Sequence, residues 1–216
     1  MTASLEFREV DHCYLVDGRP VPSVTQILDA FGMVDGTWHN PEALAWGRAV
    51  HHAIHLINHD DLDWASIDPR ISGYIQAYVN FRAQTGFTSL VSEQRLAHPG
   101  LGYAGTLDDM GFATLDGISD REKVTLIDYK TGVPAPWHHL QLAAYHGLVE
   151  ANAAALGLAS RSELPSRWIV VHLRADATYQ LRPIPVRTDR TAFHVARQRF
   201  LALVDLYHLR SKYIHD

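Results

Sequence analysis

Residues 105–132 read GTLDDMGFATLDGISDREKVTLIDYKTG and place Asp108, Asp128 and Lys130 in stretches that otherwise have the apolar character of a core. In the segment VTLIDYK, the two-residue period of a strand puts Asp128 and Lys130 on the same face. If the strand expected at about 103–114 pairs with this segment, Asp108 comes within reach of Asp128. The stretch therefore predicts a sheet that carries two carboxylates and an ammonium group close together.

Two carboxylates this close in a partly buried place repel each other, so one is protonated unless a cation lies between them. Mg²⁺ or Mn²⁺ prefers oxygen ligands and keeps water in its shell, which suits hydrolysis of a phosphate ester. Lys130 would then orient or help deprotonate the water, or offset charge that builds on phosphorus. The alternative is a solvent-exposed Asp128–Lys130 pair worth about 0–1 kcal/mol, because a D-x-K pattern alone often recurs by accident.

The segments around this stretch predict an α/β fold, with a central mixed β-sheet flanked by helices on both faces. Turn residues, caps and apolar spacing predict a hairpin over residues 5–22 with its turn at Asp17 and Gly18, helices at 23–32, 41–58, 68–86, 137–157 and 189–213, and strands at 88–97, 103–114, 123–130, 167–174 and 178–186. We expect one domain over 1–216, to which residues 1–40 add a hairpin and a helix.

Composition excludes several classes of protein. With 47% hydrophobic and 20% charged residues the chain is typical of a globular protein. A formal net charge of −5 argues against a broadly basic nucleic-acid coat, so any DNA contact should be local or assisted by a metal.

The single cysteine, Cys13, excludes an intramolecular disulfide and a cysteine-ligated zinc or iron–sulfur site within one chain. The first residues lack the pattern of a signal peptide, and no stretch approaches the roughly 18 apolar residues of a membrane helix. We expect a cytoplasmic protein without a membrane partner.

Several motifs occur in a characteristic order: GRAVH (Gly47 to His51), G-x-x-D (Gly105 to Asp108), an apolar residue followed by Asp-Tyr-Lys-Thr (Ile127 to Thr131), and Q-x-x-x-Y (Gln141 to Tyr145). This order resembles the RecB-like branch of the PD-(D/E)xK nuclease superfamily. The segments PSVTQIL and SGYIQAY narrow the resemblance to the mitochondrial genome maintenance exonucleases and related phage or bacterial exonucleases.

The resemblance implies a restriction-endonuclease-like core and a metal site formed by His51, Asp108, Asp128 and the backbone carbonyl of Tyr129, with Lys130 catalytic. It also implies that Gln141 and Tyr145, which lie four apart on one helix face, sit beside the scissile phosphate. Glu93 matches an acidic position of the family and is expected in the outer shell of the site.

The implied activity is Mg²⁺- or Mn²⁺-dependent hydrolysis of DNA, acting from ends in replication, recombination or repair. The implied substrate is DNA that is single-stranded or has single-stranded ends, with recombination or replication proteins as partners. The cluster-binding cysteines of iron–sulfur relatives are missing, and no G-x-x-x-x-G-K-[ST] loop indicates a nucleotide cofactor. A structure-specific endonuclease and an inactive DNA-binding or complex-forming module on the same fold remain alternatives.

Two assignments stay open on pattern alone. Asp109 follows Asp108 directly, so the side-chain alternation alone does not decide which of them is the acid of the G-x-x-D motif, although the spacing from Gly105 favours Asp108. His51 and His55 lie four apart and could bind zinc, but no glutamate follows the first histidine as the base of a zinc protease.

DNA contacts are predicted at Ser23, Arg48, Thr131 and Trp137, with Trp137 the first to test because it follows the catalytic strand. Thr25, Trp38, Arg70 and Arg82 are further candidates. For each of these residues, capping, packing or a solvated charge is the competing interpretation.

Overall fold

The computed structural model describes residues 4–34, 41–115, 124–158, 160, 163–184 and 190–213. Its centre is a five-stranded mixed sheet with the order β4-β5-β6-β7-β8. The strands are β4 (Thr88–His98), β5 (Tyr103–Phe112), β6 (Val124–Lys130), β7 (Arg167–Leu173) and β8 (Tyr179–Ile184). All neighbours are antiparallel except β6 and β7, which are parallel because the chain crosses over between them.

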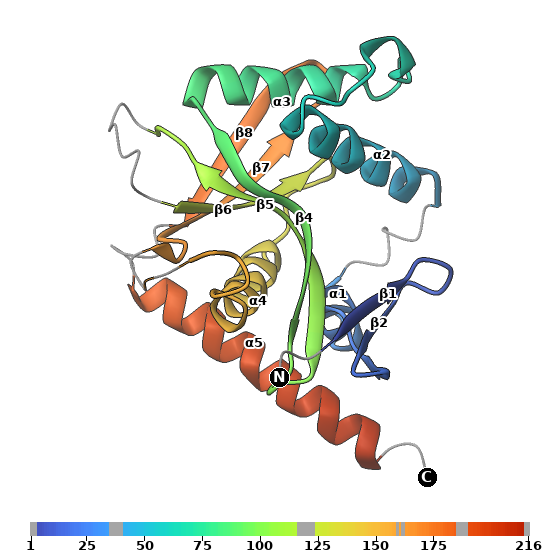
Figure 1. The fold of residues 1–216 in the computed structure, drawn as a ribbon, viewed down its shortest axis with the longest axis vertical. Helices are drawn as coiled ribbons and strands as arrows, with labels where there is room; N and C mark the ends of the chain where they lie inside the picture. Colours follow the sequence, from blue (N-terminus) through green and yellow to red (C-terminus); the bar gives the residue numbers. More distant parts are fainter. Residues whose placement is uncertain are drawn as a thin grey trace.

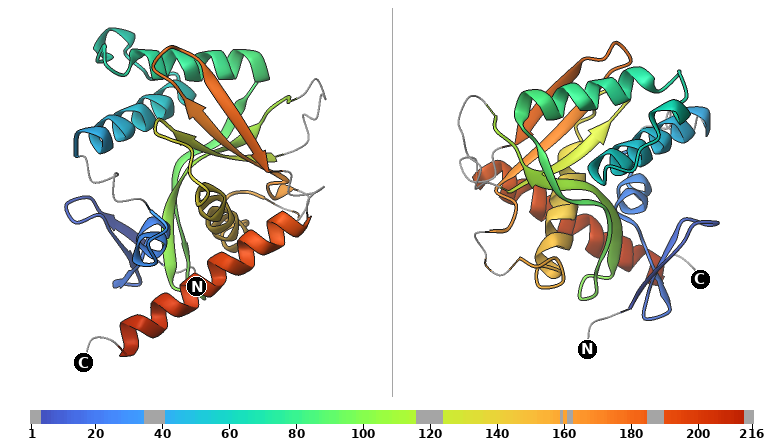
Figure 2. Two further views of the ribbon diagram at one scale, coloured as in Figure 1. Left: turned by 180° about the vertical axis from the view of Figure 1, so that it is seen from behind. Right: turned by 45° about the horizontal axis from the view of Figure 1, so that its top comes forward.

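Helices cover both faces of this sheet (Figure 1 and Figure 2). One face is covered by α2 (Pro41–Asn58) and α3 (Ser72–Thr85), with the short 3-10 helix η2 (Trp64–Ser66) between them in the chain. The other face is covered by α4 (His138–Ala151) and α5 (Arg190–Tyr213), beside the short α1 (Val24–Ala30). The predicted mixed sheet between helices is confirmed. In the part of the chain that the structure describes, no helix is long and apolar enough to cross a bilayer.

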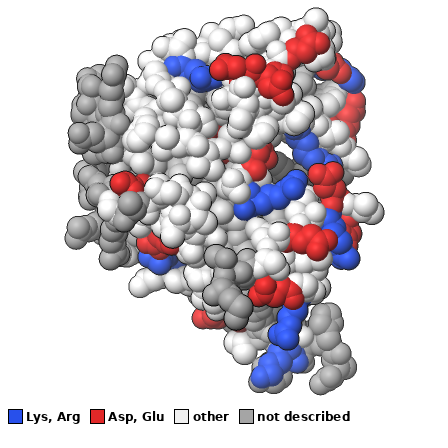
Figure 3. All heavy atoms as spheres, viewed as in Figure 1, with Lys and Arg blue, Asp and Glu red and all other residues white. Residues whose placement is uncertain are grey.

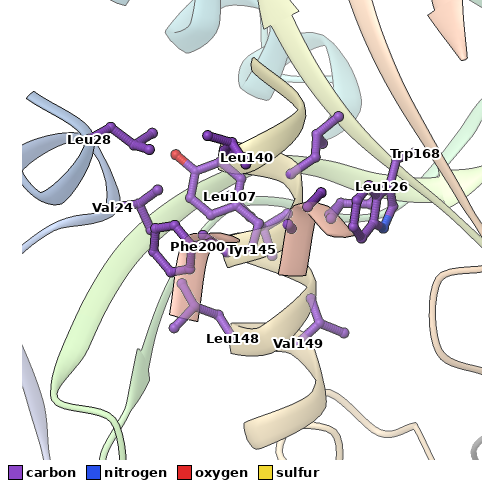
Figure 4. Packing of buried hydrophobic residues seen from close by; sticks show 14 of the residues in the cluster. Val24, Leu28, Leu107, Leu126, Leu140, Tyr145, Leu148, Val149, Trp168 and Phe200 are labelled. Atoms are coloured by element: carbon purple, nitrogen blue, oxygen red, sulfur yellow. The ribbon is translucent and has the colours of Figure 1, made fainter. Parts of the chain in front are cut away.

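The two faces of β6 follow the predicted alternation. Leu126 belongs to the apolar cluster beneath α4 and α5, and Figure 4 shows it next to Trp168. Ile127 and Tyr129 belong to the cluster beneath α2 and α3. Because all seven residues of β6 are buried, any charge on this strand lies inside the protein.

The expected N-terminal hairpin is a three-stranded meander of β1 (Leu5–Arg8), β2 (Cys13–Val16) and β3 (Arg19–Val21). Asp17 and Gly18 have φ values of 49° and 74°, as a tight turn between twisted strands requires. Ser23 then caps α1 through a reciprocal pair of hydrogen bonds with Gln26.

Two predicted helix boundaries are wrong. The helix expected from Asp68 begins at Ser72, because the Asp68 carboxylate accepts hydrogen bonds from the backbone and guanidinium of Arg70 instead of capping a longer helix. The helix expected to reach residue 157 ends at Ala151, because the Asn152 side chain donates to backbone carbonyls and closes it. Trp38 and the turn expected at 116–120 lie outside the described residues.

Candidate metal centre

The Asp108 carboxylate is fixed by the backbone of β6. The β5–β6 ladder runs as far as the pair Asp109 and Ile127. Two residues beyond Ile127, the Tyr129 N–H donates to Asp108 Oδ2 at 2.8 Å, so a side chain takes the place of a backbone acceptor. The second oxygen, Oδ1, faces His51.

His51 on α2 completes a cluster of possible metal ligands. Its Nδ1 lies 3.4 Å from Asp108 Oδ1 and 3.5 Å from Glu93 Oε1, while its Nε2 lies 3.1 Å from the carbonyl oxygen of Tyr129. One ligand atom from each of His51, Glu93 and Asp108 lies within 4.8 Å of the others. Two carboxylates and an imidazole form a donor set that fits Mg²⁺ or Mn²⁺.

Glu93 reaches this cluster through an irregularity in β4. It has a φ of 51°, in the left-handed region that few side chains other than glycine adopt. Its neighbours Ser92 and Gln94 pair regularly with Asp109 and Leu107 on β5. Such a residue inside a strand departs from the usual alternation of faces and is typical of functional sites.

The charges of the cluster compensate each other. Burial disfavours a charged His51, but attraction by Asp108 and Glu93 outweighs burial and raises the pKa of the imidazole to about 10. Burial also acts to raise the pKa of Asp108, but the opposing effects of His51, Lys130 and the Tyr129 N–H hold it below its ordinary value. The two acids thus require positive charge between them, and a proton on His51 supplies it.

Asp128 and Lys130 form a buried pair beside the cluster. Lys130 Nζ donates to Asp128 Oδ1 at 2.7 Å, and the two side chains are 9% and 0% exposed. Burial raises the pKa of Asp128 to about 6, although attraction by Lys130 opposes the shift. Among the described residues, Asp128 Oδ2 has no hydrogen-bond partner, which marks it as an acceptor without a donor.

The structure brings His51 and Asp108 together as the motifs predicted, but Glu93 takes the place in the cluster that was expected for Asp128. His51 and Asp108 lie in one cluster with Glu93, which was expected farther out, whereas Asp128 lies outside that cluster. Asp128 nevertheless interacts electrostatically with both Asp108 and His51.

Asp109 points away from this cluster and braces Tyr129. Its carboxylate accepts hydrogen bonds from Ser89 Oγ at 2.6 Å, Asn58 Nδ2 at 2.7 Å and Tyr129 Oη at 3.0 Å. Burial raises the pKa of Asp109 to about 7. Of the two adjacent acids, Asp108 therefore faces His51. The bracing by Asp109 was missed from sequence, although two consecutive acids on a buried strand indicate that both faces hold polar groups.

Gln141 and Tyr145 share one face of α4, as their spacing predicts, and Gln141 Nε2 donates to Tyr145 Oη at 2.9 Å. Both are buried. Burial raises the pKa of Tyr145 most, and the negative charges of Asp108 and Asp128 raise it further. A Cβ on Gly105 would lie 3.0 Å from Tyr145 Cε1, so the glycine allows Tyr145 to pack against β5.

The predicted DNA contacts differ in exposure. Arg48 is exposed and lies one turn before His51 on the same side of α2, and Thr131 is half-buried after β6. Ser23 is buried, and its hydroxyl accepts the N–H of Gln26 as a helix cap. Trp137 is 6% exposed and its ring centroid lies 6.0 Å from Lys130 Nζ, so it has no open face for stacking on a base.

The further arginines are engaged within the chain. Arg70 is paired with Asp68, and Arg82 donates to the carbonyl of Ile57. On the face shown in Figure 3, basic and acidic side chains of the described residues are interspersed rather than gathered into one broad basic patch.

Comparison with known proteins assigns no family, because no family model and no curated protein matches the chain. An alkaline exonuclease from Laribacter hongkongensis is 13% identical, with 89% of this chain and 93% of that chain covered and a TM-score of 0.31. The same enzyme in complex with dAMP gives 15% identity, coverage of 89% and 92%, and a TM-score of 0.33. A protein from Eubacterium rectale described as an exonuclease is 14% identical, with 86% of this chain and 81% of that chain covered and a TM-score of 0.40. At these identities and TM-scores, the similarity does not establish what this chain does.

Proposed function

We propose that this protein is a divalent-metal-dependent deoxyribonuclease that hydrolyses DNA phosphodiester bonds from DNA ends. The observation that carries the proposal is the cluster of His51, Glu93 and Asp108 beside the buried pair of Asp128 and Lys130. A donor set for a hard cation next to a buried ammonium group suits a reaction in which negative charge builds on a phosphate.

In this proposal His51, Glu93 and Asp108 hold Mg²⁺ or Mn²⁺, and the unpartnered Asp128 Oδ2 and the Tyr129 carbonyl are further oxygens available to it. When bound, such an ion polarises a phosphate oxygen and lowers the pKa of water.

Lys130 has the central role among the chain's own groups. Asp128 holds its ammonium in place through the 2.7 Å hydrogen bond, so the positive charge is already oriented before substrate arrives. A preorganised charge in a buried place attracts the phosphate more strongly than a flexible lysine on the surface.

Gln141 and Tyr145 would contact the phosphate from α4. Their side chains are buried and hydrogen-bonded to each other, so each is held in one orientation. The amide and the phenol are both neutral donors that can approach a phosphate oxygen without adding charge.

The net charge of −5 and the mixed charges in Figure 3 favour contact with a short stretch of a single strand over a broad grip on a duplex. We therefore propose DNA that is single-stranded or has single-stranded ends as the substrate, in a recombination or replication pathway.

The test compares end-labelled linear DNA with a closed single-stranded circle, each with Mg²⁺, with Mn²⁺ or with EDTA. We expect short products from the linear DNA only when a metal is present, and an intact circle. Cleavage of the circle would indicate an endonuclease, and DNA binding without cleavage would indicate an inactive module. Lys130→Met should abolish cleavage, whereas Lys212→Met, at the exposed end of α5, should retain it.

A further inference from the structure

A cavity of about 270 Å³ opens at the start of α4, next to the proposed active site. Its walls come from the loop 134–136, from His138 and His139 in the first turn of α4, from Val170 on β7 and from Arg182 on β8. None of these residues belongs to the cluster of His51, Glu93 and Asp108.

The helix end at this cavity is not capped by a side chain. Trp137 stands at the N-cap of the 14-residue α4 and makes no side-chain cap hydrogen bond. Backbone carbonyls of Ala135 and Trp137 already accept most of the N–H groups of the first turn. The aligned peptide dipoles still place partial positive charge at this end of the helix, which favours an anion.

His138 adds a buried donor. The Ala135 N–H donates to His138 Nδ1 at 3.4 Å, so the neutral ring carries its proton on Nε2. The residue is 3% exposed, and Nε2 has no hydrogen-bond partner among the residues that the structure describes. Burial, reinforced by the positive charge of Lys130, lowers the pKa of His138 to about 3, so the ring stays neutral. A buried N–H without an acceptor is costly unless a ligand supplies the acceptor.

The surrounding charge selects an anion rather than a metal cation. Two imidazoles, His138 and His172, have ring centroids 5.6 Å apart and could in principle bind zinc. However, Arg182 on the cavity wall has no ion pair within the described part of the chain, and both Arg182 and Lys130 act on His138 as positive charges. Lys130 is paired with Asp128, but the charge of Arg182 repels a cation and attracts a phosphate, which an arginine binds well.

We propose that this cavity binds a phosphate group of the DNA strand other than the one that is cleaved. Val170 on the cavity wall pairs with Asp128 across the parallel strands β6 and β7. Because Asp128 holds Lys130, the cavity lies next to the catalytic lysine. The assignment of the phosphate to DNA rests on the proposed function. An internal phosphodiester and a terminal phosphate share the same chemistry, and the experiment separates them.

The binding test uses the full chain in EDTA and inorganic phosphate as the probe, with the imidazole resonances of His138 followed by NMR. We expect a saturable shift of these resonances, and Arg182→Gln should weaken phosphate binding about tenfold, the effect of losing one charge-assisted hydrogen bond. Arg19→Gln removes the same charge from the N-terminal meander, outside the cavity, and should leave the affinity unchanged. No shift of His138, or equal weakening by both variants, would overturn the proposal.

A second measurement compares oligonucleotides with and without a 5′-phosphate for binding to the wild type and to Arg182→Gln, again in EDTA. If the cavity takes a terminal phosphate, the 5′-phosphate improves binding to the wild type only. If it takes an internal phosphodiester, both oligonucleotides lose affinity equally in the variant. If the wild type and Arg182→Gln bind each oligonucleotide with the same affinity, the cavity does not bind a DNA phosphate. Because neither readout requires cleavage, a failure of the nuclease assignment remains distinguishable from a failure of this one.

Discussion

Replacing Lys130 with methionine would remove the hydrogen-bonded partner of the buried Asp128 carboxyl group. The Nζ to Oδ1 distance is 2.7 Å and the side chains are 9% and 0% exposed, so this is a buried pair rather than a surface pair. Breaking a buried pair by removing one partner costs about 3–5 kcal/mol, whereas an exposed pair contributes about 0–1 kcal/mol. We therefore expect Lys130→Met to lower the free energy of unfolding by about 3–5 kcal/mol.

The double variant Lys130→Met with Asp128→Asn separates stability from chemistry. It removes both charges, so most of the lost stability should return, while nuclease activity should stay absent because the ammonium group is gone. Urea unfolding followed by tryptophan fluorescence measures the first quantity, and cleavage of linear DNA measures the second. A loss below about 1 kcal/mol in the single variant, or a double variant that is less stable than the single one, would refute the buried-pair reasoning.

Three further predictions test other parts of the structure. His51→Ala should shift the Mn²⁺ midpoint of cleavage to higher concentration; an unshifted metal midpoint would count against ligation of the metal by His51. The pKa of His138 is lowered to about 3 in the folded chain. Below about pH 6.5 the unfolded chain therefore binds a proton at His138 that the folded chain does not, and stability decreases as the pH decreases. Between pH 7 and pH 5 the wild type should lose about 2 kcal/mol more than His138→Gln, and equal losses in urea unfolding would contradict this. Gly111→Ala should lower the free energy of unfolding by about 1–3 kcal/mol or more, because the new Cβ would lie 2.1 Å from the Thr88 carbonyl oxygen. The control Gly100→Ala places its Cβ no closer than 3.7 Å to any other group, and similar melting temperatures for the two variants would argue against this packing.

The sheet was predictable because its signal is local. The two-residue alternation of β6 assigned Asp128 and Lys130 to one face and Tyr129 to the other, and the structure has the same arrangement. Asp17 and Gly18 likewise indicated their turn from residue type alone. Helix ends were less predictable, because the Asp68 side chain had a closer partner in Arg70.

The details of the site depend on tertiary structure that periodicity does not encode. The left-handed backbone at Glu93 breaks the alternation of β4, so spacing alone could not place this carboxylate next to His51. Trp137 was expected to be open to DNA, but packing of α4 against the sheet buries its ring. The motif order predicted that His51 and Asp108 lie close together, and the structure places His51 Nδ1 3.4 Å from Asp108 Oδ1.

The most direct test of the account is the binding of Mn²⁺ to the protein in the absence of DNA, measured from the loss of the free-ion signal in electron paramagnetic resonance. We predict saturable binding by the wild type and strong weakening by Asp108→Asn, while Asp205→Asn, on the exposed side of α5, binds like the wild type. Absence of binding by the wild type, or equal binding by Asp108→Asn, would contradict a metal centre at His51, Glu93 and Asp108.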